Sequence, residues 1–299
     1  MKILLLGANG QVGWQLRRSL SVLGEVTALH RASAFLCGDL GRPQDLAQTV
    51  RSVAPDVIVN AAAYTAVDRA ETEREAAFAV NAAACEVLAA EAARLGAWLV
   101  HYSTDYVFDG SGERPWRETD ATAPINAYGH SKLAGEQAVA AHERHLILRT
   151  SWVFDGWGQN FLKSILRAGA QRDSLKVVCD QWGAPTRAAL IADVTAHVLA
   201  QLTPGLAGIY HLAAAGATSW HGYAALAIEH AVACGLPLKI QAGNIQAIPS
   251  AQYPLPAARP ANSRLDTGKL RSSFGLALPP WQDGVRAVVA ELASFHSSR

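Results

Sequence analysis

The sequence predicts an α/β protein with a Rossmann-type, doubly wound parallel sheet and a smaller C-terminal substrate-binding lobe. Short continuous runs of Val, Ile and Leu alternate with longer helical stretches through the first half of the chain, which is typical of a parallel sheet covered on both faces. A glycine-rich turn directly follows the first apolar run. The chain has 299 residues, half of them hydrophobic, which suffices for one large unit or for two lobes that share a core.

The first half is expected to contain five β-α units. A long helix is predicted at 71–95, because this stretch is rich in Ala, Glu, Leu and Arg, contains no Gly or Pro, and stops at Gly96. Another helix should begin after Pro124. We assign residues 1–150 to a nucleotide-binding Rossmann domain. The predicted strands are 3–6, 26–29, 57–59, 98–101 and 146–148.

The pattern is looser after Arg149, and we assign residues 151–299 mainly to the second lobe. Elements near 188–212 are expected to return to the first domain. Five prolines between 237 and 260 predict irregular surface chain there. Helices are predicted at 160–168, 190–201, 220–233 and 281–293, and short strands at 176–179 and 209–212.

Composition excludes several classes of function. The chain has 26 basic and 25 acidic residues, and no run of Lys or Arg forms a stripe for nucleic acid. The four cysteines lie far apart without zinc-type or disulfide-type spacing, which favours a reducing, cytoplasmic setting. The N-terminal apolar run is too short for a signal peptide, and no uninterrupted apolar window reaches the length of a membrane span. We therefore expect neither nucleic acid nor membrane as a partner.

The glycine-rich turn has the pattern G-x-x-G-x-x-G and lies between the first strand and a helix. Glycines there allow a tight bend, and the free N–H groups of the following helix can bind a pyrophosphate. The alternative is a plain β-α turn. The residues expected to bind a dinucleotide here are Gly7, Asn9, Gly10, Gln11, Val12 and Gly13.

The second strand is followed by Arg31, where an NAD-binding site would carry an acid. Arg31 can pair with a 2′-phosphate, so NADPH is the predicted cofactor, with use of NADH left open. A solvated surface role for Arg31 is the alternative. Asp39 and Leu40 are expected to border the adenine.

Tyr128 and Lys132 are spaced i, i+4 and should share one helix face. An adjacent ammonium would lower the pKa of the Tyr128 phenol and so make it useful in acid–base chemistry. Thr104 ends the fourth strand, where a parallel sheet presents groups to a ligand, and can hydrogen-bond a carbonyl oxygen. For Thr104 and Asp105, a helix-cap or turn role is the alternative.

Taken together, these motifs resemble the dTDP-4-dehydrorhamnose reductases of the extended short-chain dehydrogenase/reductase superfamily. The likeness covers nearly the whole chain. It rests on GANGQVG at 7–13, VNAAAYTAVD at 59–68, STDYVFDG at 103–110, YGHSKLAGE at 128–136, RTSWVF at 149–154, NF at 160–161, DQWGAPT at 180–186 and RPANSRLD at 259–266.

The resemblance implies hydride transfer to the C4 ketone of a dTDP-linked 6-deoxy-4-keto sugar. It makes Tyr128 the proton donor, Lys132 the residue that binds the nicotinamide ribose and tunes Tyr128, and Thr104 a residue that polarises the ketone. Further cofactor contacts are implied for Ala62, Ala63, Tyr64, Thr65 and Tyr102. Sugar contacts are implied for Asp105, Tyr106 and Trp152, and nucleotide-diphosphate contacts for Asn160 and Arg259, although Trp152 could be a core residue and Asn160 a helix cap.

Some relatives form a dimer bridged by magnesium through acidic side chains, but the first helix here offers Gln15. Glu291 alone would be a poor magnesium site, so we predict no structural metal and a monomer or weak homodimer. Two other functions stay open. One is a nucleotide-sugar epimerase or dehydratase of the same superfamily, and the other is a non-catalytic regulatory subunit that keeps the fold.

Overall fold

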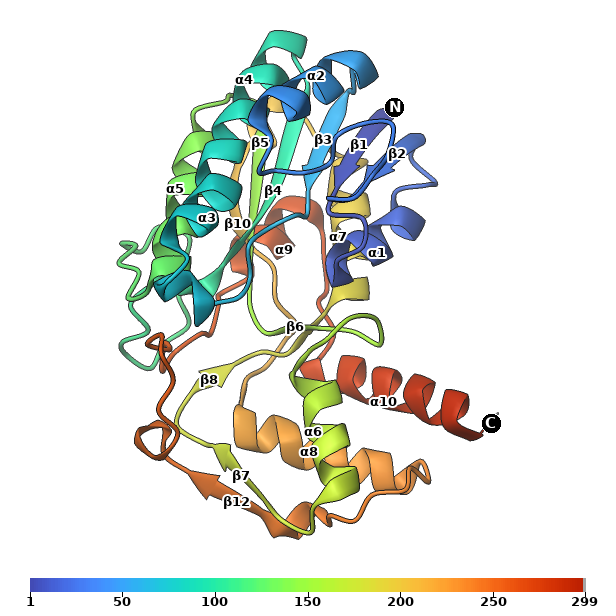
Figure 1. Ribbon diagram of the computed structural model, residues 1–299, viewed down its shortest axis with the longest axis vertical. Coiled ribbons are helices and arrows are strands. Elements are labelled where there is room, and N and C mark those ends of the chain that lie inside the picture. Colours follow the sequence, from blue (N-terminus) through green and yellow to red (C-terminus); the bar gives the residue numbers. More distant parts are fainter. Residues whose placement is uncertain (298–299) are drawn as a thin grey trace.

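The computed structural model describes residues 1–297 and contains a six-stranded parallel sheet in the order β10-β5-β4-β3-β1-β2 (Figure 1). The order reverses between β1 and β3, which places a crevice at the carboxyl ends of these strands. The predicted α/β class with a parallel sheet is confirmed. The strands are β1 (Lys2–Leu6), β2 (Glu25–Leu29), β3 (Val57–Asn60), β4 (Trp98–Thr104), β5 (His145–Thr150) and β10 (Gly208–His211).

Both faces of the sheet are buried, and alternate residues of each strand point to opposite faces. Ile3 and Leu5 of β1 lie in one core, whereas Leu4 and Leu6 lie in the other, and all four are fully buried. A continuous apolar strand is therefore required. The first core packs against α1 (Gln11–Ser19), α7 (Ala188–Leu199) and α9 (Gly268–Phe274), and the second against α2 (Pro43–Val53), α4 (Ala84–Leu95) and α5 (Ala127–Ala140).

The predicted helix at 71–95 is wrong at its start, since it begins at Arg74, and it is not a regular α-helix throughout. A 3₁₀ turn, η1 (Arg69–Glu71), precedes α3 (Arg74–Phe78), and a π-helical segment, η2 (Ala79–Ala83), joins α3 to α4. Asn81 in η2 bonds both the N–H and the carbonyl of Tyr64, so this segment holds the chain that follows β3. Tertiary hydrogen bonds, which propensity does not report, account for the irregular turn.

The continuous helical run Arg74–Leu95 is long and apolar enough to cross a membrane by length and composition, and half of its most apolar window is buried in the structure. Leu88 and Ala92 are fully buried in the core beside β3 and β4. Packing against the sheet accounts for the apolar character of this run.

The second lobe is built on α6 (Phe161–Gln171), α8 (Trp220–Ala233) and α10 (Trp281–Ser297), which enclose their own core (Figure 1). The prediction of irregular chain over 237–260 is wrong in part. This segment contains β12 (Ile245–Ile248), which pairs in parallel with β7 (Leu175–Val178). Ile245 and Ile248 are buried, so a short apolar strand forms between the prolines.

The remaining elements are short. The two-residue strands are β6 (Val153–Phe154) with β9 (Thr186–Arg187), and β8 (Trp182–Gly183) with β11 (Thr218–Ser219). The 3₁₀ turns are η3 (Asp105–Val107), η4 (Pro204–Leu206), η5 (Ala242–Asn244) and η6 (Ser250–Gln252).

The chain crosses between the two cores more than once. After β9 it forms α7, which packs on α1, and then β10, which pairs with β5. It enters the second core again with α8, returns with α9 and ends in α10. The boundary near residue 150 stays a prediction.

Candidate active site

A cavity of about 630 Å³ lies where the strand order reverses, along the carboxyl ends of β1, β3 and β4. Its size is that of a site for a small organic ligand. Of the residues predicted to bind cofactor, those that line it are Gly7, Asn9, Gly10, Gln11, Val12, Arg31, Asp39, Leu40, Ala62, Ala63, Tyr64, Thr65, Tyr102, Tyr128 and Lys132. Of those predicted to bind substrate, Thr104, Asp105, Tyr106 and Trp152 line it.

The glycine turn is shaped by close backbone contacts. Gly7 has φ +82°, and a Cβ there would lie 2.6 Å from Ala62 N. Gly13 does not line the cavity; a Cβ on it would lie 2.0 Å from Gly7 O. Gly10 caps α1 without a side-chain hydrogen bond, and the first turn of α1 has no acidic residue. The first backbone N–H groups of α1 have no partner within the helix. Together with the positive end of the helix dipole, they suit a pyrophosphate.

Arg31 lies at the edge of the cavity, exposed to solvent, and forms no ion pair with any residue in 1–297. Asp39 shapes the neighbouring loop, since its Oδ1 accepts a hydrogen bond from Gly41 N at 3.0 Å. The guanidinium of Arg31 is thus free to pair with an anionic group of a ligand.

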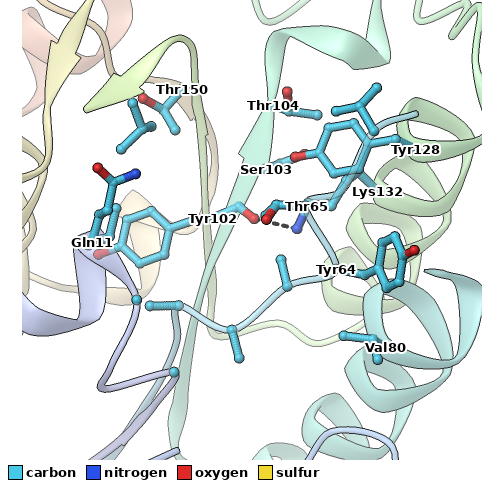
Figure 2. Close-up of a pocket in the computed structure, with 18 of the residues that line it drawn as sticks. Gln11, Tyr64, Thr65, Val80, Tyr102, Ser103, Thr104, Tyr128, Lys132 and Thr150 are labelled. Atoms are coloured by element: carbon cyan, nitrogen blue, oxygen red, sulfur yellow. Dashed lines mark hydrogen bonds between the residues drawn. The ribbon is translucent and has the colours of Figure 1, made fainter. Parts of the chain in front are cut away.

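Tyr128 and Thr104 lie on the same side of the cavity, with Gln11 and Thr150 across from them (Figure 2). The N-terminus of α5 is fixed by Asn126, whose Oδ1 accepts a hydrogen bond from Gly129 N at 2.7 Å. Tyr128 is therefore set in the first turn. Thr104 Oγ1 donates to Asp105 Oδ1 at 3.0 Å and accepts from Tyr106 N at 3.2 Å, so the turn role and the cavity position coexist.

Burial raises the pKa of the Tyr128 phenol, and the nearby Asp105 carboxylate raises it further, while a hydrogen bond with Thr104 opposes the rise. The direction is opposite to the lowering predicted from Lys132. Lys132 Nζ instead donates to Tyr102 O at 2.6 Å (Figure 2). It also lies 3.0 Å from His101 Nε2. Tyr128 is consequently a neutral phenol that holds its proton at pH 7.

Asp105 is nearly fully buried between Thr104 and Tyr106. Burial raises the pKa of its carboxyl to about 6, and hydrogen bonding by the Ser263 and Thr104 hydroxyls opposes the rise. Its Oδ2 has no hydrogen-bond partner in the described part of the chain. The carboxyl therefore lines the cavity with one oxygen unpaired.

Asp105→Asn is expected to stabilise the fold at pH 7–8. Because the folded-state pKa lies above the unfolded value, ionising Asp105 costs stability as pH rises from about 4 to above 6, by at most about 3 kcal/mol. Urea unfolding should show the variant more stable than the parent at pH 8 and nearly equal to it at pH 4. Equal stabilities at both pH values would contradict the buried, poorly paired carboxylate.

Trp152 is held in an unusual backbone conformation, with φ +49°. Its ring stacks on Trp220 with centroids 3.6 Å apart, and a Cβ on Gly183 would lie 2.6 Å from Trp152 Cε2. Trp220 also lines the cavity, and sequence reasoning missed it. Together the two indoles form an apolar part of the cavity lining, which suits a sugar ring.

Neither Asn160 nor Arg259 lines the cavity, so their predicted diphosphate contacts gain no support. Asn160 caps α6 through Lys163 N at 3.0 Å, and its Nδ2 donates to Gln11 Oε1 at 2.8 Å. Arg259 pairs with Asp68 at 2.9 Å. Their polar groups are thus already used within the protein.

Several lining residues were not predicted. Ser103 and Thr150 occupy strand ends, and this position alone could have indicated them. His30, Ala61 and Ser151 directly follow β2, β3 and β5, which is the same signal. Trp220 carried no such signal, because α8 brings it to the cavity from a distant part of the chain. The unpredicted lining residues are His30, Gly38, Ala61, Val67, Val80, Ser103, Thr150, Ser151, Val153 and Trp220.

Acidic residues near α1 are engaged with other side chains. Gln15 Nε2 donates to Asp155 Oδ1 at 3.2 Å, and Arg187 pairs with Glu291 at 2.6 Å. Within residues 1–297, no group of three or more His, Cys, Asp or Glu side chains could hold a metal ion.

Comparison with known proteins assigns the family. Residues 1–294 match the family described as RmlD substrate binding domain. The dTDP-4-dehydrorhamnose reductase of Escherichia coli K12 is 52% identical over 295 residues, which is 98% of each chain. The chain belongs to the dTDP-4-dehydrorhamnose reductase family. The resemblance inferred from the motifs is confirmed.

A second curated relative and a solved structure give the same family, and a more distant structure shares the fold. The dTDP-4-dehydrorhamnose reductase of Burkholderia thailandensis is 52% identical over 303 residues, covering 98% of this chain and all of that one. The Bacillus anthracis enzyme, solved in complex with NADP, has a TM-score of 0.88 at 34% identity and covers 97% of this chain and 99% of its own. A dTDP-glucose 4,6-dehydratase from Streptomyces venezuelae, 19% identical with a TM-score of 0.80, shares the fold.

Proposed function

We propose that this reductase-family chain reduces the C4 ketone of dTDP-4-dehydro-β-L-rhamnose with NADPH and so forms dTDP-L-rhamnose, the last step of dTDP-rhamnose synthesis. One observation carries the proposal: a single cavity joins the glycine turn of α1 to Tyr128, Thr104 and the Trp152 indole. The cavity therefore contains backbone N–H groups that can bind a dinucleotide and, in the same space, hydroxyl groups that can bind a sugar ketone. The names of its relatives support the same reaction.

The residues present fit NADPH. The glycine turn leaves room and free N–H donors for the pyrophosphate, Arg31 has a free guanidinium for the 2′-phosphate, and Lys132 lies in the wall near Tyr128. We assign the ribose contact to Lys132. When bound, the cofactor supplies the hydride that the ketone carbon receives.

The protein's own part of the chemistry is proton delivery. We assign to the Tyr128 hydroxyl the donation of a proton to the ketone oxygen as negative charge develops there. The Thr104 hydroxyl has one proton, which Asp105 Oδ1 accepts in this structure; it would donate a second hydrogen bond to the ketone oxygen by exchanging that partner for the substrate. We assign the Asp105 carboxyl to a sugar hydroxyl and the stacked indoles of Trp152 and Trp220 to the sugar face, because all three side chains line the cavity.

The proposal is tested by following NADPH oxidation at 340 nm with enzymatically prepared dTDP-4-dehydro-β-L-rhamnose and by identifying the product. Oxidation with formation of dTDP-L-rhamnose is expected. An isomerised or dehydrated sugar without net oxidation would favour the epimerase or dehydratase alternative. A folded protein that binds NADPH without turnover would favour the regulatory subunit.

Arg31→Ala should reduce the preference for NADPH over NADH. Loss of a charge-assisted bond to the 2′-phosphate is expected to lower kcat/KM for NADPH roughly 10- to 100-fold and to leave that for NADH nearly unchanged. Arg42→Ala is the control, because Arg42 pairs with Asp45 and does not line the cavity. An unchanged ratio would rule out the proposed role of Arg31.

We also propose that the protein acts in the cytoplasm without a structural metal. Cys37, Cys85, Cys179 and Cys234 are free thiols, as a reducing compartment requires. Light scattering should give the same mass with and without EDTA, near the 31.7 kDa of one chain or in a weak equilibrium with the dimer. A stable dimer that EDTA dissociates would contradict this expectation.

A further inference from the structure

The segment 155–160, which joins β6 to α6, lies against the glycine turn at the start of α1. Trp157 Nε1 donates to Asn9 O at 3.0 Å, and Asn160 Nδ2 donates to Gln11 Oε1 at 2.8 Å. Asn9 and Gln11 line the cavity, whereas Trp157 and Asn160 do not. The segment can therefore act on a ligand in the cavity only through the turn.

Hydrogen bonds within the chain fix the shape of this segment. Lys163 Nζ donates to Gly156 O at 3.1 Å and to Gly158 O at 2.8 Å, which ties both carbonyls to the first turn of α6. Gly158 has φ +77°, and a Cβ there would lie 2.9 Å from Gln11 Cγ. A glycine is thus required for the segment to approach the Gln11 side chain this closely.

The backbone N–H of Lys163 determines which amide atoms of Asn160 and Gln11 donate. Lys163 N donates to Asn160 Oδ1 at 3.0 Å, so this atom of Asn160 is the oxygen and the other is the nitrogen. Asn160 Nδ2 has two N–H groups, and its acceptors are Asp155 O at 2.7 Å and Gln11 Oε1 at 2.8 Å. The Gln11 atom that meets Asn160 must accept, so it is the amide oxygen.

The amide nitrogen of Gln11 consequently points away from Asn160. Gln11 Nε2 forms no hydrogen bond within residues 1–297, and Figure 2 shows it on the side of Gln11 that faces Tyr128 and Thr104. Its two N–H groups are donors without an acceptor in this part of the chain. Gln11 is also the first residue of α1, where backbone N–H groups and the helix dipole favour an anion.

We propose that Asn160 is a positioning residue that holds the Gln11 side chain so that its amide N–H groups bind a phosphate oxygen of a diphosphate ligand. The identity of the ligand rests on the proposed function, in which both NADPH and the dTDP-sugar carry a diphosphate. The position of Gln11 directly after Gly10 of the glycine turn favours the pyrophosphate of the cofactor. Asn160 thus acts on the diphosphate without touching it.

Asn160→Ser is the first test. Serine keeps a hydroxyl that can cap α6 through Lys163 N, but it removes the donor to Gln11. The Gln11 amide is then no longer held, and ordering it on binding should raise the Kd for NADPH, measured by cofactor fluorescence, roughly three- to tenfold. The Kd for dTDP, measured by calorimetry, should stay the same. A rise for dTDP alone would assign the Gln11 donors to the sugar nucleotide, and no change for either ligand would overturn the proposal.

Gln11→Met tests whether Asn160 acts through Gln11. Methionine keeps the Cγ that lies against Gly158 and removes the amide, so the Kd for NADPH should rise roughly 10- to 100-fold. Adding Asn160→Ser to Gln11→Met should have no further effect, because the bond that it removes is already absent. If the two changes were additive, Asn160 would act independently of Gln11 and the proposal would be overturned.

Asn160→Asp reverses the donor order at nearly constant size. One carboxylate oxygen can still accept from Lys163 N, but the other can only accept, so Gln11 must turn its N–H groups toward it and away from the cavity. The Kd for NADPH should rise more than in Asn160→Ser. Gln159→Glu is the charge control, because Gln159 is exposed and does not line the cavity. An equal rise in this control would show an effect of charge and not of donor order.

These binding measurements need no turnover, so they separate this inference from the reductase function. If NADPH binding responds to Asn160→Ser as expected but the parent protein does not reduce the sugar, the reductase function is wrong and the role of Asn160 stands. If the parent protein reduces the sugar and Asn160→Ser leaves the Kd for both ligands unchanged, the reductase function stands and the role of Asn160 is wrong.

Discussion

Tyr128→Phe is expected to lower kcat roughly 10²- to 10⁴-fold, the usual contribution of a positioned general acid. The hydroxyl is the only atom group removed, and the phenyl ring keeps its edge-to-face contact with Tyr106, where the ring centroids are 5.6 Å apart. The dissociation constant for NADPH, measured by fluorescence, should therefore stay within about threefold of the parent value. Loss in kcat with retained cofactor binding would identify a defect in the chemical step.

Tyr223→Phe is the matched control. Tyr223 is also fully buried, and its hydroxyl has no hydrogen-bond partner in residues 1–297. It packs in the core of the second lobe and does not line the cavity, so its variant should retain parental kcat. If both variants lost activity equally, or if Tyr128→Phe kept it, Tyr128 would not be the proton donor.

Glu136→Gln should lower the free energy of unfolding by roughly 3–5 kcal/mol, because it leaves the buried Arg149 charge without a counterion. The two side chains are each 3% exposed and meet through paired bonds of 2.8 and 2.6 Å between α5 and β5. The guanidinium also lies over the Phe108 ring at 5.0 Å. Urea unfolding at pH 7 measures the loss.

Asp45→Asn provides the comparison for the same chemical change at an exposed pair. Arg42 and Asp45 are 65% and 43% exposed, and breaking such a pair costs less than about 1 kcal/mol. A double variant, Glu136→Leu with Arg149→Met, should recover much of the loss, since an apolar pair needs no counterion. If Glu136→Gln and Asp45→Asn lowered the free energy of unfolding by the same small amount, the buried Arg149 charge would not require its counterion.

Much of the fold could be predicted because the pattern of apolar residues along the chain matches the burial of those residues in the folded structure. The apolar runs at β1 and β3 contain nothing but residues that suit a strand buried on both faces. The turn after β1 contains glycine where a Cβ would collide with neighbouring backbone, as Gly7 and Gly13 show. Errors arose where distant contacts decided the local conformation, as in η2, whose Asn81 bonds the chain after β3.

The residues of the candidate site also fall into two groups: those that local sequence pattern predicts and those whose role depends on contacts with distant residues. Tyr128, Lys132 and Thr104 were predictable because each stands at a strand end or in a helix turn that the topology turns toward the cavity. Asn160 and Arg259 were expected at the diphosphate from the family resemblance and from their chemistry, whereas the structure engages them with Gln11 and Asp68. Side-chain type states what a residue can bind, but neighbouring groups decide whether it is free.

The sequence by itself determined the α/β class, the dinucleotide turn and the Tyr128–Lys132 pair, because these depend on residues adjacent along the chain or one helical turn apart. Only the tertiary structure decided the stacking of Trp220 on Trp152 and the contact of His101 with Lys132. It also decided the direction of the Tyr128 pKa, since burial and the Asp105 charge act through space. Desolvation and through-space charge depend on what surrounds a group in three dimensions, which no spacing along the chain reports.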